Sequence, residues 1–310
     1  MQHFVFLFLM CFQISLHAAN TTLKLNLNWK PEPQFGGFYE AQRLGKFQLK
    51  EVEVKIYEGG SGTPTVQMLQ NGQTDFAIVS AEEILLANEK DPQKPLVALF
   101  AVYQKNPQVI MAREDSGLNS VQDIFKSNGI LAVQRGLSYF LFLEKKYGKP
   151  KVKIVPYQGG IGVFLQNKLY SQQGFATSEP LSAEKSGVKT KIFPIADEGF
   201  NPYTTVVAVR AEDLKSKKEL ITQVISAVRS GWESYLKNPD LTNAMMMKLN
   251  PSLDAATFKK SAEVQIPYIQ TKGSRLGEMT EERWSQLYQQ LVELKVLKGK
   301  QKLDGLFVNL

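Results

Sequence analysis

The chain has 310 residues, of which 43% are hydrophobic and 22% are charged, and its net charge is +7 with a pI near 9.2. This length is enough for two modest domains with their own cores, and the composition is ordinary for a soluble globular protein. The lysines are scattered, without a dense basic block interleaved with aromatic residues, so the charge indicates a basic, solvated surface rather than a nucleic-acid site.

The N-terminus carries a short apolar run at residues 4–16, followed by two alanines at 18–19. The run is too short to span a bilayer comfortably, and small residues suit a cleavage site, so we expect residues 1–19 to be a secretory signal peptide. A buried N-terminal strand is the alternative. Lipid anchoring at Cys11 is a further alternative, although Met10 is large where a small residue is expected. Cys11 is the single cysteine, so the mature protein would have neither a disulfide framework nor a cysteine metal site.

The first element after this segment is a strand at residues 23–28, where leucines alternate with polar residues. Pro31 and Pro33 end it, because neither can donate to a β-ladder. A short helix follows as far as Leu44, and Gly45 suits the left-handed position beyond a helix end. Small ligands bind open α/β sheets beyond the carboxyl ends of the strands, which makes this loop a candidate site.

A second strand is predicted at residues 52–56, followed by a glycine-rich loop at 58–63. Thr63 is a good N-cap and Pro64 fits the first helical position. The free amides of this loop would suit an anion or a carbonyl oxygen, and a plain turn with a helix cap is the alternative. The candidate ligand residues here are Ser61, Gly62 and Thr63.

A buried strand is predicted at 75–79, after which Ser80 and Glu83 form a capping box at the start of a helix. Ser80 is also a candidate ligand residue. The alternation of strands and helices indicates a parallel sheet, which a strand at 95–103 extends. Residues 104–107 form the first crossing to a second lobe.

The second lobe and the C-terminal part continue this pattern. Further strands are predicted at 109–112, 130–133, 152–155, 174–176, 192–195 and 204–209, with helices at 120–125, 134–148, 163–169, 217–236, 244–249 and 281–297. We therefore expect an α/β fold of two lobes, each a mostly parallel sheet flanked by helices, with a ligand cleft between them. Lobe 1 would comprise residues 20–103 and 205–310, and lobe 2 residues 104–204.

Aromatic residues lie at the predicted loops and helix starts of both lobes. They are Trp29, Phe35, Tyr39, Tyr139, Tyr157 and Tyr203. Aromatic rings on both sides of a cleft would sandwich a flat heteroaromatic ring, and we expect three of the six to contact ligand. Packing in the core or hinge is the alternative.

Two charged residues are candidate anchors for the ligand. Glu179 follows a predicted strand and can pair with the amidine-like edge of an aminopyrimidine, the alternative being a salt bridge at the surface or hinge. Arg135 heads a predicted helix and can hold a carboxylate, sulfonate or phosphate, the alternative being a solvated or inter-domain pair. Glu32 and Glu58 are expected to be solvated.

No motif in the sequence supports an enzyme, although chemistries that need neither histidine nor cysteine stay open. The only histidines are His3 and His17, both in the expected signal peptide, which argues against Ser-His-Asp or Cys-His catalysis and against histidine metal ligation. We expect a protein that is not an enzyme and that carries no cofactor and no metal.

Several motifs resemble the thiamine-pyrimidine (NMT1/THI5-like) family of periplasmic solute-binding proteins of ABC transporters, in the type II periplasmic binding protein superfamily. They are Asn28-Trp29-x-Pro31, Gly37-Phe38-Tyr39, Leu44-Gly45-x-Phe47, the loop 58–64 and Asn71-Gly72-x-x-Asp75-Phe76-Ala77. The resemblance covers about residues 23–240.

The resemblance implies a monomeric periplasmic protein that captures a pyrimidine precursor of thiamine for an ABC permease in the inner membrane. Riboflavin, sulfonate, nitrate and taurine are rival ligands. An enzyme of pyrimidine synthesis, or a sensor lobe, is a rival of a different class. The yeast-type synthases of the family use a histidine and a cysteine-rich segment, and neither occurs beyond residue 17 of this chain.

Overall fold

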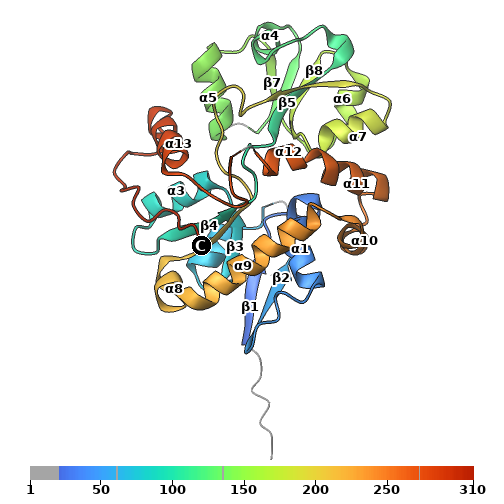
Figure 1. The fold of residues 1–310 in the computed structure, drawn as a ribbon. Coiled ribbons are helices and arrows are strands. Elements are labelled where there is room, and N and C mark those ends of the chain that lie inside the picture. Colours follow the sequence, from blue (N-terminus) through green and yellow to red (C-terminus); the bar gives the residue numbers. More distant parts are fainter. Residues whose placement is uncertain (1–20, 61, 135, 272) are drawn as a thin grey trace, which may run out of the picture.

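The computed structural model describes residues 21–310 except residues 61, 135 and 272. The expected signal peptide and the candidate ligand residues Ser61 and Arg135 therefore lie outside the described residues. Across the described part, strands and helices form two α/β lobes, drawn one above the other in Figure 1, which confirms the predicted fold class. Within that part of the chain, no helix is long and apolar enough to cross a membrane.

Lobe 1, the lower lobe in Figure 1, is built on a five-stranded sheet with the strand order β2-β1-β3-β10-β4. Its strands are β1 (Thr21–Asn26), β2 (Val52–Tyr57), β3 (Phe76–Val79), β4 (Leu96–Ala101) and β10 (Val206–Arg210). β1 pairs in parallel with β2 and β3, whereas β10 runs antiparallel to β3 and β4. The sheet is therefore completed by a strand from far along the sequence.

Lobe 2 repeats this plan with the strand order β7-β6-β8-β5-β9. Its strands are β5 (Gln108–Arg113), β6 (Ile130–Val133), β7 (Lys153–Pro156), β8 (Tyr170–Phe175) and β9 (Thr190–Pro194). β5 is antiparallel to β8 and β9, while β6 is parallel to β7 and β8. The antiparallel strands, β10 in lobe 1 and β5 in lobe 2, are each the first strand after a crossing. Each of them starts next to the other lobe and runs away from that lobe, because the chain has just crossed over.

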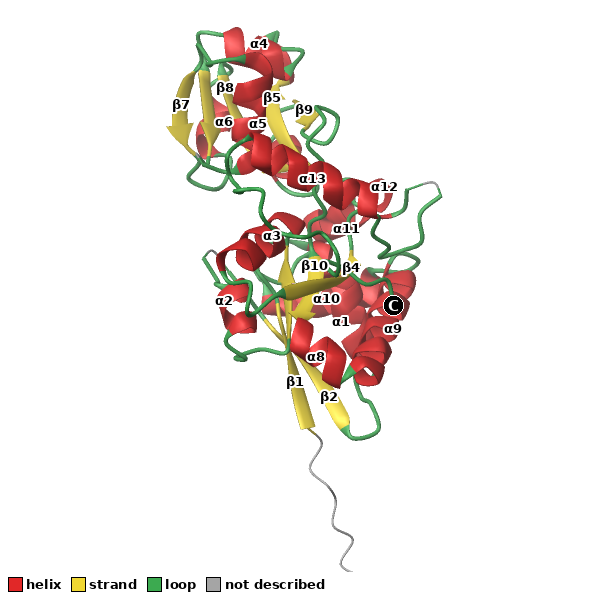
Figure 2. Cartoon of the chain, turned by 90° about the vertical axis from the view of Figure 1, so that its left-hand side faces the viewer, coloured by secondary structure: helices red, strands yellow, loops and turns green. Residues whose placement is uncertain are grey.

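Helices surround both sheets (Figure 2). Those of the first half are η1 (Pro33–Phe35), α1 (Gly36–Arg43), α2 (Thr65–Gln70), α3 (Ala81–Lys90), η2 (Glu114–Ser116), α4 (Val121–Lys126) and α5 (Ser138–Tyr147). Those of the second half are α6 (Gly162–Gln166), α7 (Glu179–Lys185), α8 (Ala211–Ser216), α9 (Lys218–Tyr235), α10 (Asp240–Leu249), α11 (Ala255–Val264), α12 (Ile266–Ile269) and α13 (Glu281–Glu293).

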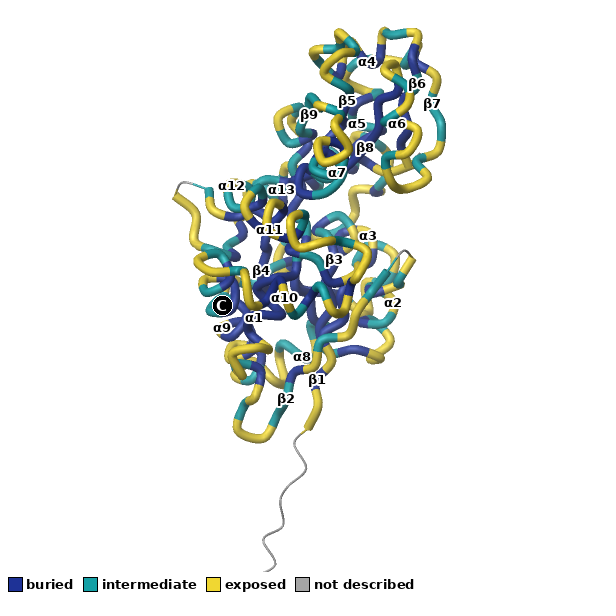
Figure 3. The backbone as a smooth tube through the Cα atoms, turned by 90° about the vertical axis from the view of Figure 1, so that its right-hand side faces the viewer, coloured by how far each residue is buried: buried dark blue, intermediate teal, exposed yellow. Residues whose placement is uncertain are grey.

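The two faces of the lobe 1 sheet belong to different hydrophobic clusters, as the period of two in a strand requires. Phe76 and Ile78 of β3 pack with residues of α1 and α9, whereas Ala77 and Val79 pack with residues of α3 and α13. The cluster that contains Ala77 and Val79 continues into lobe 2, where it includes buried residues of β5, β6 and α5. Figure 3 shows the buried chain running through the centre of both lobes.

The two crossing segments are tied together by Arg283 of α13. Its guanidinium donates to the carbonyl oxygen of Gln104 at 2.6 Å and to that of Asn201 at 2.7 Å. It also lies 3.8 Å from the centre of the Tyr203 ring. Burial lowers the pKa of Arg283 to about 10, which still leaves it charged at neutral pH. One buried cation therefore fixes both segments that connect the lobes.

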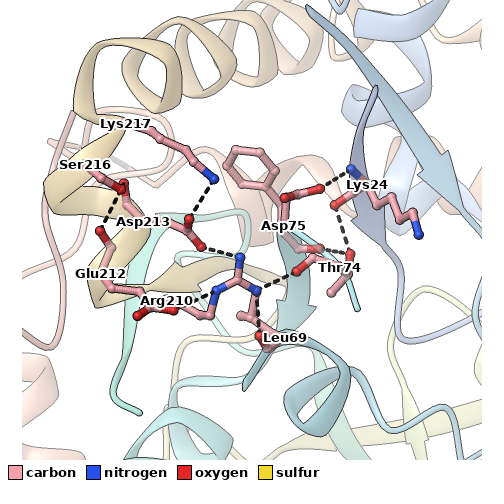
Figure 4. A network of polar contacts seen from close by, with 10 residues as sticks. Lys24, Leu69, Thr74, Asp75, Arg210, Glu212, Asp213, Ser216 and Lys217 are labelled. Carbon is pink, nitrogen blue, oxygen red and sulfur yellow. Dashed lines mark hydrogen bonds and ion pairs between the residues drawn. The ribbon is translucent and has the colours of Figure 1, made fainter. Parts of the chain in front are cut away.

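A second arginine fastens the far end of lobe 1 (Figure 4). Arg210, the last residue of β10, donates to the carbonyl oxygens of Leu69 at 2.8 Å and Thr74 at 2.9 Å. It also forms an ion pair with Asp213, which accepts a hydrogen bond from Lys217 at 2.8 Å. These contacts attach the turn between α2 and β3 to the start of α8.

Most element positions follow the sequence, with errors at two helix starts. The helix predicted to open at residue 134, with Arg135 at its head, begins only at Ser138. The capping box of Ser80 and Glu83 is confirmed at the start of α3. The prediction that Thr63 caps the next helix is wrong, because α2 begins at Thr65 and the hydroxyl of Thr63 instead accepts from the backbone N–H of Gly60 at 2.9 Å. The helices η2, α7, α8, α11 and α12 were not predicted.

Candidate functional site

Trp29 lies in the loop after β1, at the end of lobe 1 that faces lobe 2, and its side chain is 38% exposed. The indole Nε1 donates to Oε1 of Glu32 at 3.1 Å. Gly59 donates its N–H to the Trp29 carbonyl at 3.1 Å, and a Cβ at Gly59 would lie 2.2 Å from the Leu27 carbonyl oxygen. This close approach requires glycine, and it joins the loops that follow β1 and β2.

The expectation that Glu32 is solvated is wrong in part, because the residue is half-buried. Burial raises the pKa of its carboxyl to about 7, the hydrogen bond from Trp29 and the charge of Lys30 lower it, and the charge of Glu179 raises it. Glu32 belongs to lobe 1 and Glu179 to lobe 2, and both lie on the sides of the lobes that helix α11 joins. We call this region, with Trp29 and Glu32 on one side and Tyr157 and Glu179 on the other, the lobe junction.

Glu179 is the first residue of α7 and its carboxylate is held in place by lobe 2. Oε1 accepts from the Tyr157 hydroxyl at 2.8 Å, and Oε2 accepts from the Phe175 N–H at 2.8 Å. A Cβ at Gly174 would approach Oε2 to 3.1 Å, so the side chain lies folded over the end of β8. Each carboxylate oxygen can accept a further hydrogen bond, which leaves this half-buried group able to bind a donor.

Helix α11 brings the two sides of the junction together. It packs against η1 of lobe 1, which follows Glu32, and against α7 of lobe 2, which begins at Glu179. Lys185 of α7 forms an ion pair with Asp254, the N-cap of α11. A crevice of about 310 Å³ lies beside this ion pair, between α7 and the start of α11, and none of the four residues that define the lobe junction lines it. Figure 1 shows α11 and α12 between the lobes.

Of the six predicted aromatic residues, Trp29 and Tyr157 lie at the lobe junction. The ring of Tyr157 is partly exposed, and burial together with the charge of Glu179 raises the pKa of its hydroxyl above the ordinary value. Tyr39 of α1 is only 2% exposed, and its hydroxyl has no partner among the described residues. It packs in the core behind the Trp29 loop.

The other three aromatic residues are packed into the protein rather than placed at the junction. Phe35 is completely buried beside α1. Tyr139 donates to Oε1 of Gln173 at 2.6 Å, and Tyr203 lies under Arg283 and accepts from the Thr280 N–H at 3.1 Å. We leave these three out of the proposed site, since core and hinge contacts account for them.

The candidate residues of the glycine-rich loop and the β3 end are engaged in local structure. Thr63 and Gly60 form a turn in which Thr63 N–H donates to the Gly60 carbonyl at 3.1 Å, with Gly62 at a φ of 81°. The Ser80 hydroxyl accepts from the Glu83 N–H at 3.2 Å. These contacts support the turn and cap alternative for Thr63 and Ser80.

A polar contact behind Glu32 was missed in the sequence. Tyr103, two residues after the end of β4, donates to Oε1 of Gln265 at 3.0 Å, and Nε2 of Gln265 donates to the Pro33 carbonyl at 3.0 Å. Both side chains are fully buried. No local pattern marks Gln265, because its partners lie 162 and 232 residues away in sequence.

The polar and aromatic side chains of the junction suit hydrogen bonding and ring stacking. Two carboxylates, an indole and a phenol offer acceptors for paired N–H groups and a face for a flat ring. In the described part of the chain, no group of three or more His, Cys, Asp or Glu side chains is placed to hold a metal ion.

Comparison with known proteins places this geometry in a family. A family model described as NMT1/THI5 like matches residues 32–242. A 4-amino-5-hydroxymethyl-2-methylpyrimidine phosphate synthase from Legionella pneumophila is 18% identical over 302 residues, which are 96% of this chain and 94% of that protein.

Two solved structures are similar to this one. The periplasmic aliphatic sulphonate binding protein SsuA from Escherichia coli has a TM-score of 0.69 at 14% identity, over 90% of this chain and 89% of that chain. The alkanesulfonate-binding protein SsuA from Xanthomonas axonopodis pv. citri, bound to MOPS, has a TM-score of 0.66 at 11% identity, over 94% and 100%. At such identities the likeness establishes the periplasmic binding protein fold, without the ligand.

Proposed function

Since this chain belongs to the NMT1/THI5-like family, we propose that it is the solute-binding component of an ABC importer and that it captures a pyrimidine precursor of thiamine. The observation that carries the proposal is the fixed carboxylate of Glu179, which lies with Tyr157 on one side of the lobe junction while the exposed indole of Trp29 lies on the other. A flat ring bound there would stack on the indole and present its N–H edge to the carboxylate.

The charge of the junction supports an aminopyrimidine over a sulfonate. Two carboxylates face it, and a desolvated like charge beside them is costly. No ion pair joins Glu32 or Glu179 to a lysine or arginine among the described residues. A neutral or cationic ring with two N–H donors meets no such penalty.

We further propose that the protein binds its solute without transforming it, although one relative is named as a synthase. The sequence has no histidine or cysteine beyond His17, so the residues that the yeast-type synthases use are missing. Incubating the purified protein with candidate pyrimidines, with and without iron, is expected to return them unchanged. Product formed in proportion to protein would contradict this.

Transport is expected to rely on hinge closure between the lobes. The two crossings held by Arg283 connect otherwise separate sheets, and closure upon a solute would create the form that a permease in the inner membrane recognises. This role implies export to the periplasm, with removal of residues 1–19. Sequencing the mature N-terminus tests it: retained Met1 on cytoplasmic protein contradicts export, and acylated Cys11 identifies a lipoprotein.

Native mass spectrometry of the protein purified from its own cells tests the ligand class. The expected result is a bound species with the mass of a small nitrogen heterocycle, released on denaturation. A bound sulfonate, nitrate or taurine would contradict the thiamine-precursor proposal and leave the fold assignment intact.

A further inference from the structure

We propose that Gln134, the first residue after β6, donates a hydrogen bond to the solute, and that Gln173 of β8 is the buried residue that positions it. The inference rests on the proposed function in one respect, namely that the solute binds beside Glu179. It adds a donor next to that acceptor. A donor and an acceptor side by side recognise a ring nitrogen that is adjacent to an amino group.

Gln134 lies close to Glu179 because one tyrosine reaches from one to the other. The Tyr157 N–H donates to the carbonyl oxygen of Val133, the residue before Gln134, at 3.2 Å. The hydroxyl of the same tyrosine donates to Oε1 of Glu179 at 2.8 Å. β6 lies between β7 and β8 and runs parallel to both, so these residues follow three neighbouring strands at one edge of the sheet.

The orientation of the Gln173 carboxamide follows from one backbone donor. Its Oε1 accepts from the backbone N–H of Gln134 at 2.7 Å and from the Tyr139 hydroxyl at 2.6 Å. A backbone N–H only donates, so the amide atom that it meets is the oxygen and not the nitrogen. Both side chains are buried, with Gln173 8% exposed and Tyr139 2% exposed.

This orientation decides how the Gln134 side chain is placed in turn. Nε2 of Gln173 only donates, and it meets Oε1 of Gln134 at 3.1 Å. The other end of the Gln134 amide, its Nε2, accepts nothing and has no acceptor of its own among the described residues. Because Gln134 is exposed, this N–H₂ group is available to a solute at the end of β6.

The buried network has a consequence beyond stability. A carboxamide in a core is unfavourable unless its polar atoms form hydrogen bonds, and Gln173 forms three. Two of the three end on Gln134. An apolar side chain would fill the same space without that requirement, so what the network provides is one defined arrangement of the loop after β6.

Two isomers test whether the site reads an adjacent ring nitrogen: 2-aminopyridine and 3-aminopyridine. They have the same size and the same amino group for Glu179, but only in 2-aminopyridine is the ring nitrogen next to that group. At pH 9 both rings are neutral. Titration followed by NMR is expected to show that the wild type binds 2-aminopyridine about threefold to tenfold more tightly than its isomer, the worth of one hydrogen bond.

A substitution at the exposed position tests the donor itself. Gln134→Glu keeps an acceptor for Gln173 and removes the N–H₂ group, so the preference for 2-aminopyridine should disappear. Gln122→Glu introduces the same charge at an exposed position of α4 and should keep the preference.

A substitution at Gln173 tests the positioning role. The carboxylate of Gln173→Glu can accept from both the backbone N–H and Nε2 of Gln134, which turns the oxygen of Gln134 outward. The ratio of the two affinities should then fall to about one or below. If the buried charge prevents folding, Gln173→Met takes its place, since it releases the Gln134 amide and should also abolish the preference. A merely structural role would weaken both isomers and leave their ratio unchanged.

The outcomes separate this inference from the proposed function. Equal affinity for the isomers in the wild type, tighter binding of 3-aminopyridine, no binding of either, or a preference that survives in Gln134→Glu or in the folded variant at Gln173 overturns the inference. A preference that depends on both glutamines, without binding of 4-amino-5-hydroxymethyl-2-methylpyrimidine, supports the inference and contradicts the thiamine-precursor proposal. Pyrimidine binding without an isomer preference does the reverse.

Discussion

Trp29 differs from the other two tryptophans in its surroundings. Trp232 and Trp284 are buried to 0% and 1% exposure, whereas Trp29 is 38% exposed and donates to Glu32. A large apolar ring left in solvent beside a fixed carboxylate is what a stacking platform for a ligand looks like before binding. The same position at the end of β1 made Trp29 a candidate from the sequence alone.

Two substitutions of Trp29 separate ring stacking on the ligand from the hydrogen bond to Glu32. Trp29→Ala is expected to cost roughly 1–3 kcal/mol of affinity for an aminopyrimidine, the order found for stacking of aromatic side chains on bases. Trp29→Phe keeps a ring and loses the donation to Glu32, so it should cost less. Titration calorimetry measures both, and wild-type fluorescence should change on binding. Unchanged affinity in a folded Trp29→Ala variant would remove the indole from the site.

The raised pKa of Glu32 predicts how the stability of the unliganded protein depends on pH. Its folded pKa of about 7 lies above the ordinary 4.5, so the folded protein binds an extra proton between these values and is stabilised at low pH. That contribution is lost as pH rises through 7, by up to about 3 kcal/mol. The free energy of unfolding, measured with urea, should fall less from pH 5 to pH 8 for Glu32→Gln than for Glu51→Gln, which removes the same charge from an exposed position. Equal drops would contradict the buried, proton-binding carboxylate.

The residues of the site were only partly predictable, for a physical reason. Trp29 and Glu179 follow strands, and that local signal was enough to select them. Glu32 was expected to be solvated, and it is half-buried. The carbonyl of the next residue, Pro33, is held by Gln265, which is 232 residues away, and such long-range contacts leave no local pattern.

At the scale of elements, the contact between α1 and α9 fixes the loop that carries the site. A Cβ added at Gly37 of α1 would lie 2.1 Å from Cγ of Trp232. A Cβ added at Gly231 of α9 would lie 2.2 Å from the carbonyl oxygen of Gly37. Glycines on both helices therefore let the backbones approach. Because α1 follows η1 directly, this contact holds the end of the Trp29 loop.

Gly37→Ala is expected to lower the free energy of unfolding by about 1–3 kcal/mol, the usual cost of overpacking a core. Gly162→Ala in α6 is a matched control, because no heavy atom lies within 4 Å of its Cβ position. Chemical denaturation of both variants gives the comparison. Equal stability of the two variants would show that α1 and α9 can separate without cost.

Elements with strong periodicity or caps were predicted well, and short packed ones were not. The strands of both sheets and the Ser80 capping box follow from local sequence. The failures are the starts of α2 and α5 and the helices η2, α7, α8, α11 and α12. α12 has only four residues and α7 seven, so their positions depend on packing at the lobe junction.

At the scale of the whole molecule, the alternation of strands and helices predicted two α/β lobes, and the two sheets confirm them. What the alternation did not reveal is that α11 bridges the lobes next to the site, in contact with η1 and α7. That helix lies late in the chain and carries no motif. Its placement explains why residues separated by about half of the sequence form one junction.

The central claim is that this junction binds a solute with paired N–H donors through Glu179, rather than an anionic solute. Calorimetry with 4-amino-5-hydroxymethyl-2-methylpyrimidine and with MOPS, on wild type, Glu179→Gln and Tyr157→Phe, tests it. Tyr157→Phe is the control that keeps the charge and removes one hydrogen bond to the carboxylate. Thermal unfolding would establish that all three proteins are folded.

The wild type is expected to bind the pyrimidine and not MOPS. Glu179→Gln should lose roughly 1.5–3 kcal/mol, about ten- to hundredfold in affinity, and Tyr157→Phe should lose less. Tighter binding of MOPS by Glu179→Gln, with no pyrimidine binding by any of the proteins, would contradict the account.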